Sequence, residues 1–171
     1  MAIPATNHRG RNSNMAAMRR IRDGDLQRVL ALARKTGVFT TEEVGVVKEL
    51  SEAELKNPAQ NGYHGLIFEE NDKVVGFACY GPTPMTEGTY DLYWLFVDPK
   101  HQRRGVGGTL LGEVEKAIRR AKGRMLIADT SSSPSYVPAR RFYQEHGFQK
   151  VAEVGDYYSP GDSRLTYVKK F

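Results

Sequence analysis

The stretch from Leu92 to Leu111, LYWLFVDPKHQRRGVGGTLL, constrains the fold more than any other part of the chain. Its apolar, aromatic first half ends at Asp98-Pro99 and predicts a strand, and the apolar residues that follow the glycines recur at helical spacing. Between these segments, Gly105, Gly107 and Gly108 lack a Cβ and let a ligand approach the main chain closely. Free N–H groups in the turn and the helix dipole would attract an anion there. The stretch therefore predicts a strand, an anion-binding turn and a helix.

The spacing of the glycines decides which phosphate compound the turn suits. No Lys-Ser or Lys-Thr pair follows them, as a P-loop requires, and Gly112 falls one place too late for the dinucleotide pattern G-x-G-x-x-G. The pattern Q/R-x-x-G-x-G/A does match, from Gln102 to Gly107. Because a strand ending in Val97-Asp98-Pro99 precedes it, this segment resembles the loop that binds the acyl-coenzyme A pyrophosphate in the GNAT N-acetyltransferases.

A second segment, farther along the chain, resembles the same family. Residues Arg124 to Thr130 predict a short buried strand, and Pro138 to His146 predict a helix that stops at Gly147. The string ARRFYQEHGF is similar to the family's second signature, an alanine-led helix that carries Phe-Tyr and closes in Gly-Phe. The resemblance covers about residues 16 to 171 and is strongest from Tyr90 to Phe148.

The predicted elements follow the order β-α-α-β-β-β-α-β-α-β-β, which is that of the GNAT fold. We therefore predict an α/β fold with a mixed, mostly antiparallel central sheet, splayed at the cofactor strands and flanked by helices. Residues 1–15 are predicted to form a disordered tail, and 16–171 a single acetyltransferase domain. A hairpin turn is expected at Asn71-Asp72, and loops at 57–62 and 155–164. The predicted strands cover residues 18–22, 63–69, 73–80, 90–97, 124–130, 149–154 and 165–170.

Two of the predicted helices have recognisable starting signals. Asp23-Gly24-Asp25 offers a cap for a helix that begins at Leu26. Thr40 and Glu43 have the spacing of a capping box, in which each residue satisfies a backbone N–H of the other.

The resemblance implies acetyl-coenzyme A as acyl donor and cosubstrate, held between the strands 90–97 and 124–130. Main-chain groups of Leu95, Phe96 and Val97 would hold the pantetheine arm, with a backbone N–H near Leu95 facing the thioester carbonyl. The pyrophosphate would lie on the glycine-rich loop, at Gln102, Arg103, Arg104, Gly105, Val106, Gly107, Gly108 and Thr109. Six basic residues are expected to gather around this loop: Arg103, Arg104, Arg119, Arg120, Lys122 and Arg124.

Two side chains are predicted to carry the proton transfers. Tyr143 matches the tyrosine of the family's second helix, whose hydroxyl serves the departing thiolate, and an aromatic core residue is the alternative interpretation. Asp91 lies on the coenzyme-bearing strand, where some members keep a glutamate, and could accept the amine proton directly or through water. A solvated or substrate-positioning carboxylate is the alternative for Asp91. Glu87 and Asp129 are further candidates for the base.

The chain departs from the family pattern at Tyr136. Many members place an asparagine there, three residues before the helix alanine, and its amide contacts the coenzyme; the serines between 131 and 135 offer substitute hydrogen-bonding groups. The string from Asp156 to Asp162 is rich in turn formers, aromatics and acids. It predicts either a plain hairpin loop or, with neighbouring side chains, a wall of the acceptor site. Those neighbours are Glu87, Tyr90 and the helix pair near Phe39 to Glu43.

Composition narrows the classes of function. The single cysteine, Cys79, excludes an internal disulfide and a multi-cysteine zinc site, and it suits a small buried core position. The scattered histidines form no metal pattern. No apolar run approaches the roughly 20 residues that cross a bilayer, and no secretory apolar segment opens the chain, so a cytoplasmic location is expected. The net charge of +5 is mild, and the basic residues lack interleaved aromatics, which disfavours a nucleic-acid surface.

These observations predict an acetyl-coenzyme A-dependent N-acetyltransferase that acts on a small amine or amino-acid-like acceptor by direct attack in a ternary complex. Acetylation of a protein N-terminus or lysine is the alternative within the fold, and it would need an open groove in place of a closed pocket. A non-catalytic acyl-coenzyme A-binding module is the alternative from another class. No metal, nucleic acid or membrane is expected as a partner, and a homodimer is left open.

Overall fold

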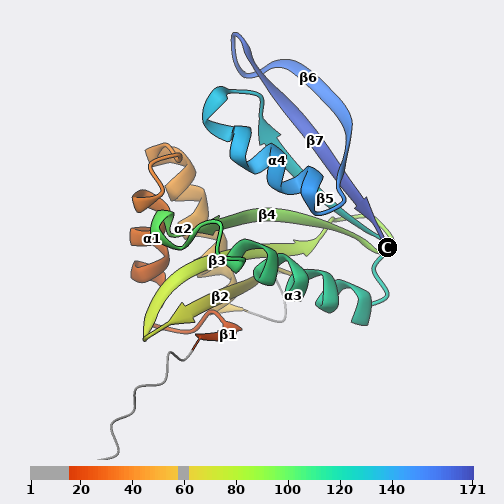
Figure 1. Cartoon of the computed structure of the whole chain (residues 1–171). Coiled ribbons are helices and arrows are strands. Elements are labelled where there is room, and N and C mark those ends of the chain that lie inside the picture. The colour runs from red at the N-terminus through yellow and green to blue at the C-terminus, as the bar shows by residue number, and fades with distance from the viewer. Residues whose placement is uncertain (1–15, 58–61) are drawn as a thin grey trace, which may run out of the picture.

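The computed structural model describes residues 16–57 and 62–171, which form one seven-stranded sheet with helices on both faces (Figure 1). The strand order is β1-β2-β3-β4-β5-β7-β6, and only the neighbours β4 and β5 are parallel. The strands are β1 (Ala16–Arg20), β2 (His64–Glu70), β3 (Lys73–Pro82), β4 (Thr89–Val97), β5 (Met125–Ser131), β6 (Gln149–Ser159) and β7 (Asp162–Lys170). The helices are α1 (Leu26–Lys35), α2 (Thr41–Lys56), α3 (Val106–Arg120) and α4 (Val137–Glu145), with short 3₁₀ turns η1 (Pro99–His101) and η2 (Pro134–Tyr136). The predicted fold class is confirmed.

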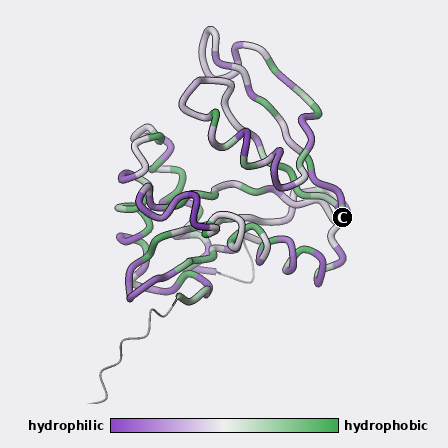
Figure 2. The backbone as a smooth tube through the Cα atoms, viewed as in Figure 1, coloured by the Kyte–Doolittle hydropathy of each residue, from purple (hydrophilic) through white to green (hydrophobic). Residues whose placement is uncertain are grey.

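The helices divide between the two faces of the sheet. α1 and α2 share one buried cluster with Phe77 and Phe96, whereas α3 and α4 share another with Leu92 and Leu126. An apolar stripe at helical spacing explains the position of α3. Its buried residues are Val106, Leu110, Leu111, Val114 and Ile118. Figure 2 shows hydrophobic and hydrophilic residues alternating along this helix, as expected for one that lies against a sheet.

Local sequence signals set several boundaries. The predicted capping box is confirmed: Glu43 N donates to Thr40 Oγ1 at 3.1 Å, and Thr40 N donates to Glu43 Oε2 at 2.7 Å. Asn71 and Asp72 take φ values of 51° and 60°, so the predicted turn between β2 and β3 is confirmed. The predicted tail at 1–15 and most of the loop predicted at 57–62 lie outside the described residues.

The C-terminal hairpin differs from its prediction as a loop over residues 155–164. β6 continues to Ser159 and β7 begins at Asp162, so only Pro160 and Gly161 make the turn. The ladder does shift register between Val154 and Ser159, so residues 155–158 bulge away from β7. The mixture of turn formers, acids and aromatic residues here does not distinguish a loop from such a bulge, and the expected loop was therefore too long.

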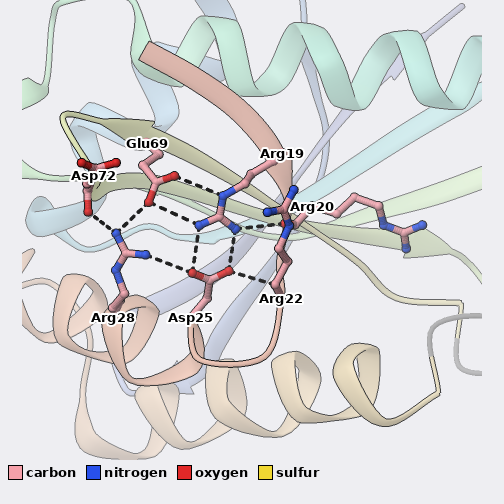
Figure 3. Close-up of polar contacts among 7 residues, drawn as sticks. All are labelled: Arg19, Arg20, Arg22, Asp25, Arg28, Glu69 and Asp72. Carbon is pink, nitrogen blue, oxygen red and sulfur yellow. Dashed lines mark hydrogen bonds and ion pairs between the residues drawn. The ribbon is translucent and has the colours of Figure 1, made fainter. Parts of the chain in front are cut away.

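An ion-pair network joins β1, α1 and β2 (Figure 3). Arg19 donates to both oxygens of Asp25, at 2.6 and 2.9 Å, and also to Glu69. Arg28 reaches the same two carboxylates, and the Arg22 N–H donates to Asp25 at 2.9 Å. The Asp25 side chain is only 5% exposed, so its charge depends on these partners.

The sheet is split between its two central strands. β4 and β5 pair only through Thr89–Asp91 and Met125–Ile127, and no later residue of either strand pairs with the other in the described chain. A register shift of the β3–β4 ladder at Cys79 and Tyr80 lies just beyond this point, and such irregularities increase local twist. Figure 1 shows the result, in which β5–β7 and α4 rise away from β4. The prediction of a sheet splayed at these strands is confirmed.

Candidate active site

The split gives the molecule an opening with a closed end and two diverging arms. The closed end is the last β4–β5 pair, Asp91 with Ile127. One arm is the remainder of β4, from Leu92 to Val97, and the other is the remainder of β5. The predicted pantetheine contacts, Leu95, Phe96 and Val97, therefore lie on the arm of β4, where the backbone edge that faces β5 has no strand partner among the described residues.

The glycine-rich loop lies at the far end of the β4 arm. Arg103 and Gly105 both have positive φ, 58° and 84°, and Gly105 starts α3 as its N-cap. Within the described chain, no hydrogen-bond acceptor is recorded for the backbone N–H groups of residues 103 to 108. Such a row of free N–H groups at a helix N-terminus is a site for a phosphate group.

Gln102 and Thr109 differ from the free amides of the loop. Gln102 Nε2 donates to the Val97 carbonyl at 3.2 Å and so ties the loop to the end of β4. The Thr109 N–H and Oγ1 both donate to the Gly105 carbonyl at 2.9 Å. Thr109 is thus where regular helical pairing begins, and its N–H is not free for a ligand.

The second signature helix packs directly on this loop. A Cβ at Gly107 would lie 3.2 Å from the Phe142 ring, and one at Gly108 would lie 2.9 Å from His146 Nε2. The Phe142 and His146 rings stack at 4.1 Å, and His146 Nδ1 lies 2.8 Å from the Phe142 carbonyl oxygen. The two sequence signatures therefore meet in space, and a side chain at either glycine would require the neighbouring ring to shift.

The cations near the loop are fewer than predicted. Arg103 and Arg104 are exposed there; Arg104 Nη2 lies 3.6 Å from Glu70, which also pairs with His101 at 3.0 Å. The expectation that Arg119, Arg120, Lys122 and Arg124 gather around the loop is wrong, because they follow or end α3. A helix of 15 residues is about 22 Å long, so they lie at its opposite end. There, Arg119 covers the Phe171 ring and Arg124 donates to the Glu87 carbonyl.

Tyr143 is buried on the α3 side of the sheet and only 9% exposed. Its ring lies against Phe148 and Tyr167, with centroid distances of 5.4 and 5.7 Å. Burial, and to a lesser degree the nearby Asp129 carboxylate, raises the pKa of its phenol to about 12. The core position and the predicted acid role are therefore compatible, because a phenol with this pKa keeps its proton at neutral pH.

The three carboxylates considered for the base take different positions. Asp91 forms part of the closed end of the split, and Thr83 Oγ1 donates to its Oδ2 at 2.7 Å. Asp129 lies on β5 two residues beyond that end, where its exposed carboxylate accepts from Thr166 Oγ1 at 2.6 Å. Glu87 precedes β4, and the contact recorded for it is the one between its backbone carbonyl and Arg124. Asp91 and Asp129 are therefore the carboxylates beside the opening.

The α2 side of the split is lined by aromatic and acidic groups from both arms. Phe39 packs edge-on against Trp94 and Phe96 of β4, with centroid distances of 5.2 and 5.4 Å. From the other arm, the Tyr136 hydroxyl donates to Glu43 Oε1 at 2.9 Å. Tyr158 and Asp162 lie near enough to Tyr136 to raise the pKa of its phenol, although burial and the Glu43 hydrogen bond contribute more. Tyr136 thus connects the hairpin side to residues 39–43, and that these segments line an acceptor site stays a prediction.

Two members of the predicted wall lie elsewhere. Tyr90 packs into the cluster on the α3 side of the sheet, and Glu87 contacts Arg124 below the closed end. Sequence reasoning also missed Trp94, whose Nε1 is buried and has no hydrogen-bond partner among the described residues. An aromatic residue inside an apolar strand has the pattern of a core residue, so no sequence signal indicated this free donor.

The remaining observations concern the cysteine, metal ligands and membrane-spanning helices. Cys79 is buried, and burial raises the pKa of its thiol to about 12, as expected for a core residue. Within residues 16–57 and 62–171, no group of three or more His, Cys, Asp or Glu side chains is placed to hold a metal ion. No helix in the same ranges is both long and apolar enough to span a bilayer.

Within the described chain, the structure thus combines a split sheet with a row of free backbone amides at a helix N-terminus. The family of acetyltransferase (GNAT) domains matches residues 61–150, and the chain belongs to this family. A solved GNAT-family structure from Desulfovibrio desulfuricans has 43% identity and a TM-score of 0.88, and the match covers 91% of this chain and 99% of that chain.

Two further proteins are similar to this chain. An L-methionine sulfoximine/L-methionine sulfone acetyltransferase of Salmonella typhimurium is 30% identical over 95 residues, and the match spans only 54% of this chain and 54% of that protein. The PaiA N-acetyltransferase of Thermoplasma acidophilum, solved in complex with coenzyme A, has a TM-score of 0.72 at 16% identity, and the match covers 92% of this chain and 99% of that chain. This second likeness is one of fold.

Proposed function

We propose that this protein is an acetyl-coenzyme A-dependent N-acetyltransferase that acts on a small, amino-acid-like primary amine by direct attack in a ternary complex. The observation that carries the proposal is the split between β4 and β5 beside the free N–H groups of residues 103 to 108. The coenzyme A complex of a structural neighbour and the amino-acid analogue named for a relative support the choice of donor and acceptor. A cytoplasmic location remains a prediction from the sequence.

The residues around the split fit such a donor. When bound, acetyl-coenzyme A supplies an activated acetyl thioester. The amides of residues 103 to 108 would hold its pyrophosphate, with the exposed Arg103 as a countercharge, and the open edge of β4 at Leu95 to Val97 would hold the pantetheine arm. A cleft that positions both reactants can supply roughly 7–11 kcal/mol of the barrier.

Proton transfer is assigned to two side chains on opposite faces of the sheet. Asp91, at the closed end of the split, would accept the proton of the attacking amine, directly or through a water molecule. Tyr143, which keeps its proton at neutral pH, would donate to the departing thiolate from the α3 side. Asp129 and Glu43 add negative charge on the acceptor side, which favours a cationic amine.

The test is a screen of primary amines with acetyl-coenzyme A, followed by thiol release. Amino acids and their analogues with a free α-amine, methionine sulfoximine among them, should release coenzyme A at rates well above the rate without acceptor. Calorimetry with coenzyme A should show binding in the same preparation. If coenzyme A binds and no amine increases thiol release, the protein is a non-catalytic binding module instead.

A further inference from the structure

The hydrogen bond between Tyr136 and Glu43 links two parts of the chain that the split separates. Tyr136 ends η2, just before α4, which packs on the α3 side of the sheet beyond β5. Glu43 belongs to α2, which packs on the opposite face beside β4. Because the partners come from different arms and different faces, their bond at 2.9 Å crosses the open end of the split.

Both ends of this link are anchored. On the β4 arm, Glu43 is fixed by the capping box with Thr40, and Phe39 packs on the aromatic rings of β4. On the β5 arm, the serines that precede Tyr136 are tied to the hairpin. Ser131 Oγ and Ser132 N donate to Asp162 Oδ1, at 2.5 and 3.1 Å. A second tie is Arg140 Nη1, which donates to the carbonyls of Ser131 and Ser133, both at 2.8 Å. The link therefore joins two rigid supports.

We propose that the Tyr136–Glu43 hydrogen bond closes the open end of the split and thereby limits the acceptor to an amine of about amino-acid size. This inference rests on the proposed function, since it concerns the acceptor of that reaction. With the bond in place, the opening is a window bounded by β4, β5 and the two side chains. A peptide N-terminus or a lysine side chain on a protein would need an open groove through which the rest of its chain can leave. The bond occupies that exit.

The link explains why a tyrosine at position 136 departs from the family pattern. An asparagine at this position is too short to reach α2 from η2, whereas the phenol of a tyrosine spans the gap. The carboxylate of Glu43 accepts from Tyr136 through Oε1 and from the Thr40 amide through Oε2. One side chain therefore both caps α2 and forms the link across the split. These two residues set specificity and do not touch the reacting atoms.

The first test compares acceptors of increasing length. Methionine sulfoximine, an alanine-initiated dipeptide and an alanine-initiated hexapeptide are assayed by thiol release with the wild type, Tyr136→Phe, Tyr136→Ala and Glu43→Ala. The ratio of kcat/KM for the hexapeptide to that for methionine sulfoximine should rise about tenfold or more in Tyr136→Ala, with coenzyme A affinity unchanged. Tyr80→Phe, which removes a buried phenol on the α3 side, is the matched control and should leave the ratio unchanged. A wild type that acetylates the hexapeptide as efficiently as methionine sulfoximine would overturn the inference.

The second test needs no turnover, because Trp94 is the only tryptophan of the chain and packs against Phe39 on the α2 side of the split. Acrylamide should quench its fluorescence more strongly in Tyr136→Ala and Glu43→Ala than in the wild type or Tyr80→Phe. The free energy of unfolding should also fall less in a Tyr136→Phe/Glu43→Ala double variant than the sum of its decreases in the two single variants. Unchanged quenching together with additive losses would overturn the inference even in an active enzyme. An inactive wild type with altered quenching in the variants would instead contradict the proposed function alone.

Discussion

Tyr143 has the burial of a core residue and the chemistry of a proton donor. Its ring is held between Phe148 and Tyr167, so the direction of its hydroxyl is fixed by packing. Within the described chain the hydroxyl has no hydrogen-bond partner, and it is not one of the fully buried polar atoms that lack one. It is therefore free to donate to a ligand, as the proposed role requires.

Replacing Tyr143 by Phe should therefore separate the two roles. The ring stays in the core, so the melting temperature and the coenzyme A affinity should change little, whereas kcat should fall about 10²-fold because the proton donor is lost. Steady-state kinetics and calorimetry on the same preparation provide the measurement. Phe142→Leu, which alters the neighbouring ring that contacts Gly107, is the control and should affect coenzyme A binding first. Turnover of Tyr143→Phe near the wild-type value would leave the residue as part of the core only.

Asp91 and Asp129 can be distinguished by pH. If Asp91 is the base, Asp91→Asn should lower kcat/KM and flatten the acidic limb of its pH profile, because the titrating group is gone. Asp129→Asn should then keep that limb and mainly raise KM for a cationic amine, as expected when only binding is lost. The measurement is kcat/KM against pH for both variants with one acceptor. An acidic limb that disappears in Asp129→Asn and persists in Asp91→Asn would reverse the assignment.

At the scale of elements, the loop before α3 should bind its anion by backbone amides. Gly107→Ala and Gly107→Asp both introduce a Cβ 3.2 Å from the Phe142 ring, so they share one steric cost. Only the aspartate adds a negative charge at the helix N-terminus, where it competes with a pyrophosphate. Calorimetry should show moderately weaker coenzyme A binding for the alanine variant and an almost complete loss for the aspartate variant.

Gly112→Asp is the control for charge on the same helix. It lies five residues, about one and a half turns, farther along α3, where a Cβ would meet no atom of the described residues within 4 Å, and it should leave the affinity nearly unchanged. Equal affinities of Gly107→Asp and Gly107→Ala would argue against anion binding by these amides.

Sequence signals between residues a few positions apart predicted the helices and turns of the structure well. The Thr40–Glu43 capping box, the turn at Asn71-Asp72 and the helix after Gly105 all depend on residues a few positions apart, and the structure contains each of them. The pairing of Tyr136 with Glu43 spans 93 positions, and neither residue type indicates its partner. Its existence depends on the direction in which the two arms diverge, which only the assembled sheet determines.

Two errors in the sequence prediction have local causes instead. The basic residues from Arg119 onward were expected at the glycine-rich loop because they are close to it in sequence. The length of α3 places them at the opposite end of the helix. Likewise, the polar and aromatic string after Val154 predicted a loop, whereas pairing with β7 extends the hairpin to Ser159. The first error concerns the geometry of one helix and the second concerns pairing with the next strand, and composition alone indicates neither.

For the whole molecule, the network of Arg19 should couple stability to pH. Hydrogen bonds from Arg19 are the main cause that lowers the pKa of both Asp25 and Glu69, with Arg28 adding to the effect on Glu69. A lowered pKa in the folded state means that the carboxylate stabilises the fold above its ordinary pKa, which is 3.8 for Asp25. This stability is lost as the pH falls through the lower, folded value.

Asp25→Asn should destabilise the protein by about 3 kcal/mol at pH 7, because it leaves the guanidinium of Arg19 with one carboxylate partner in a largely buried position. The difference from the wild type should begin to shrink below about pH 4, where the carboxylate of the unfolded wild type takes up a proton, and should be smallest below the lowered pKa of the folded state. Urea unfolding at a series of pH values measures both effects. Asp23→Asn, which changes a neighbouring carboxylate outside the network of Figure 3, should show neither. If the free energy of unfolding of Asp25→Asn stays below that of the wild type by a constant amount down to pH 2, the proposed link between this network and pH is wrong.

The split in the sheet also bears on how the ligand-free protein behaves at high concentration. An unpaired strand edge is a template for other chains, and proteins usually hide or interrupt such edges. Among the described residues, the inner edge of β4 beyond Asp91 has no strand partner, because β5 turns away from it. A bound coenzyme would cover the same edge, so it would act as a cap against self-association as well as a substrate.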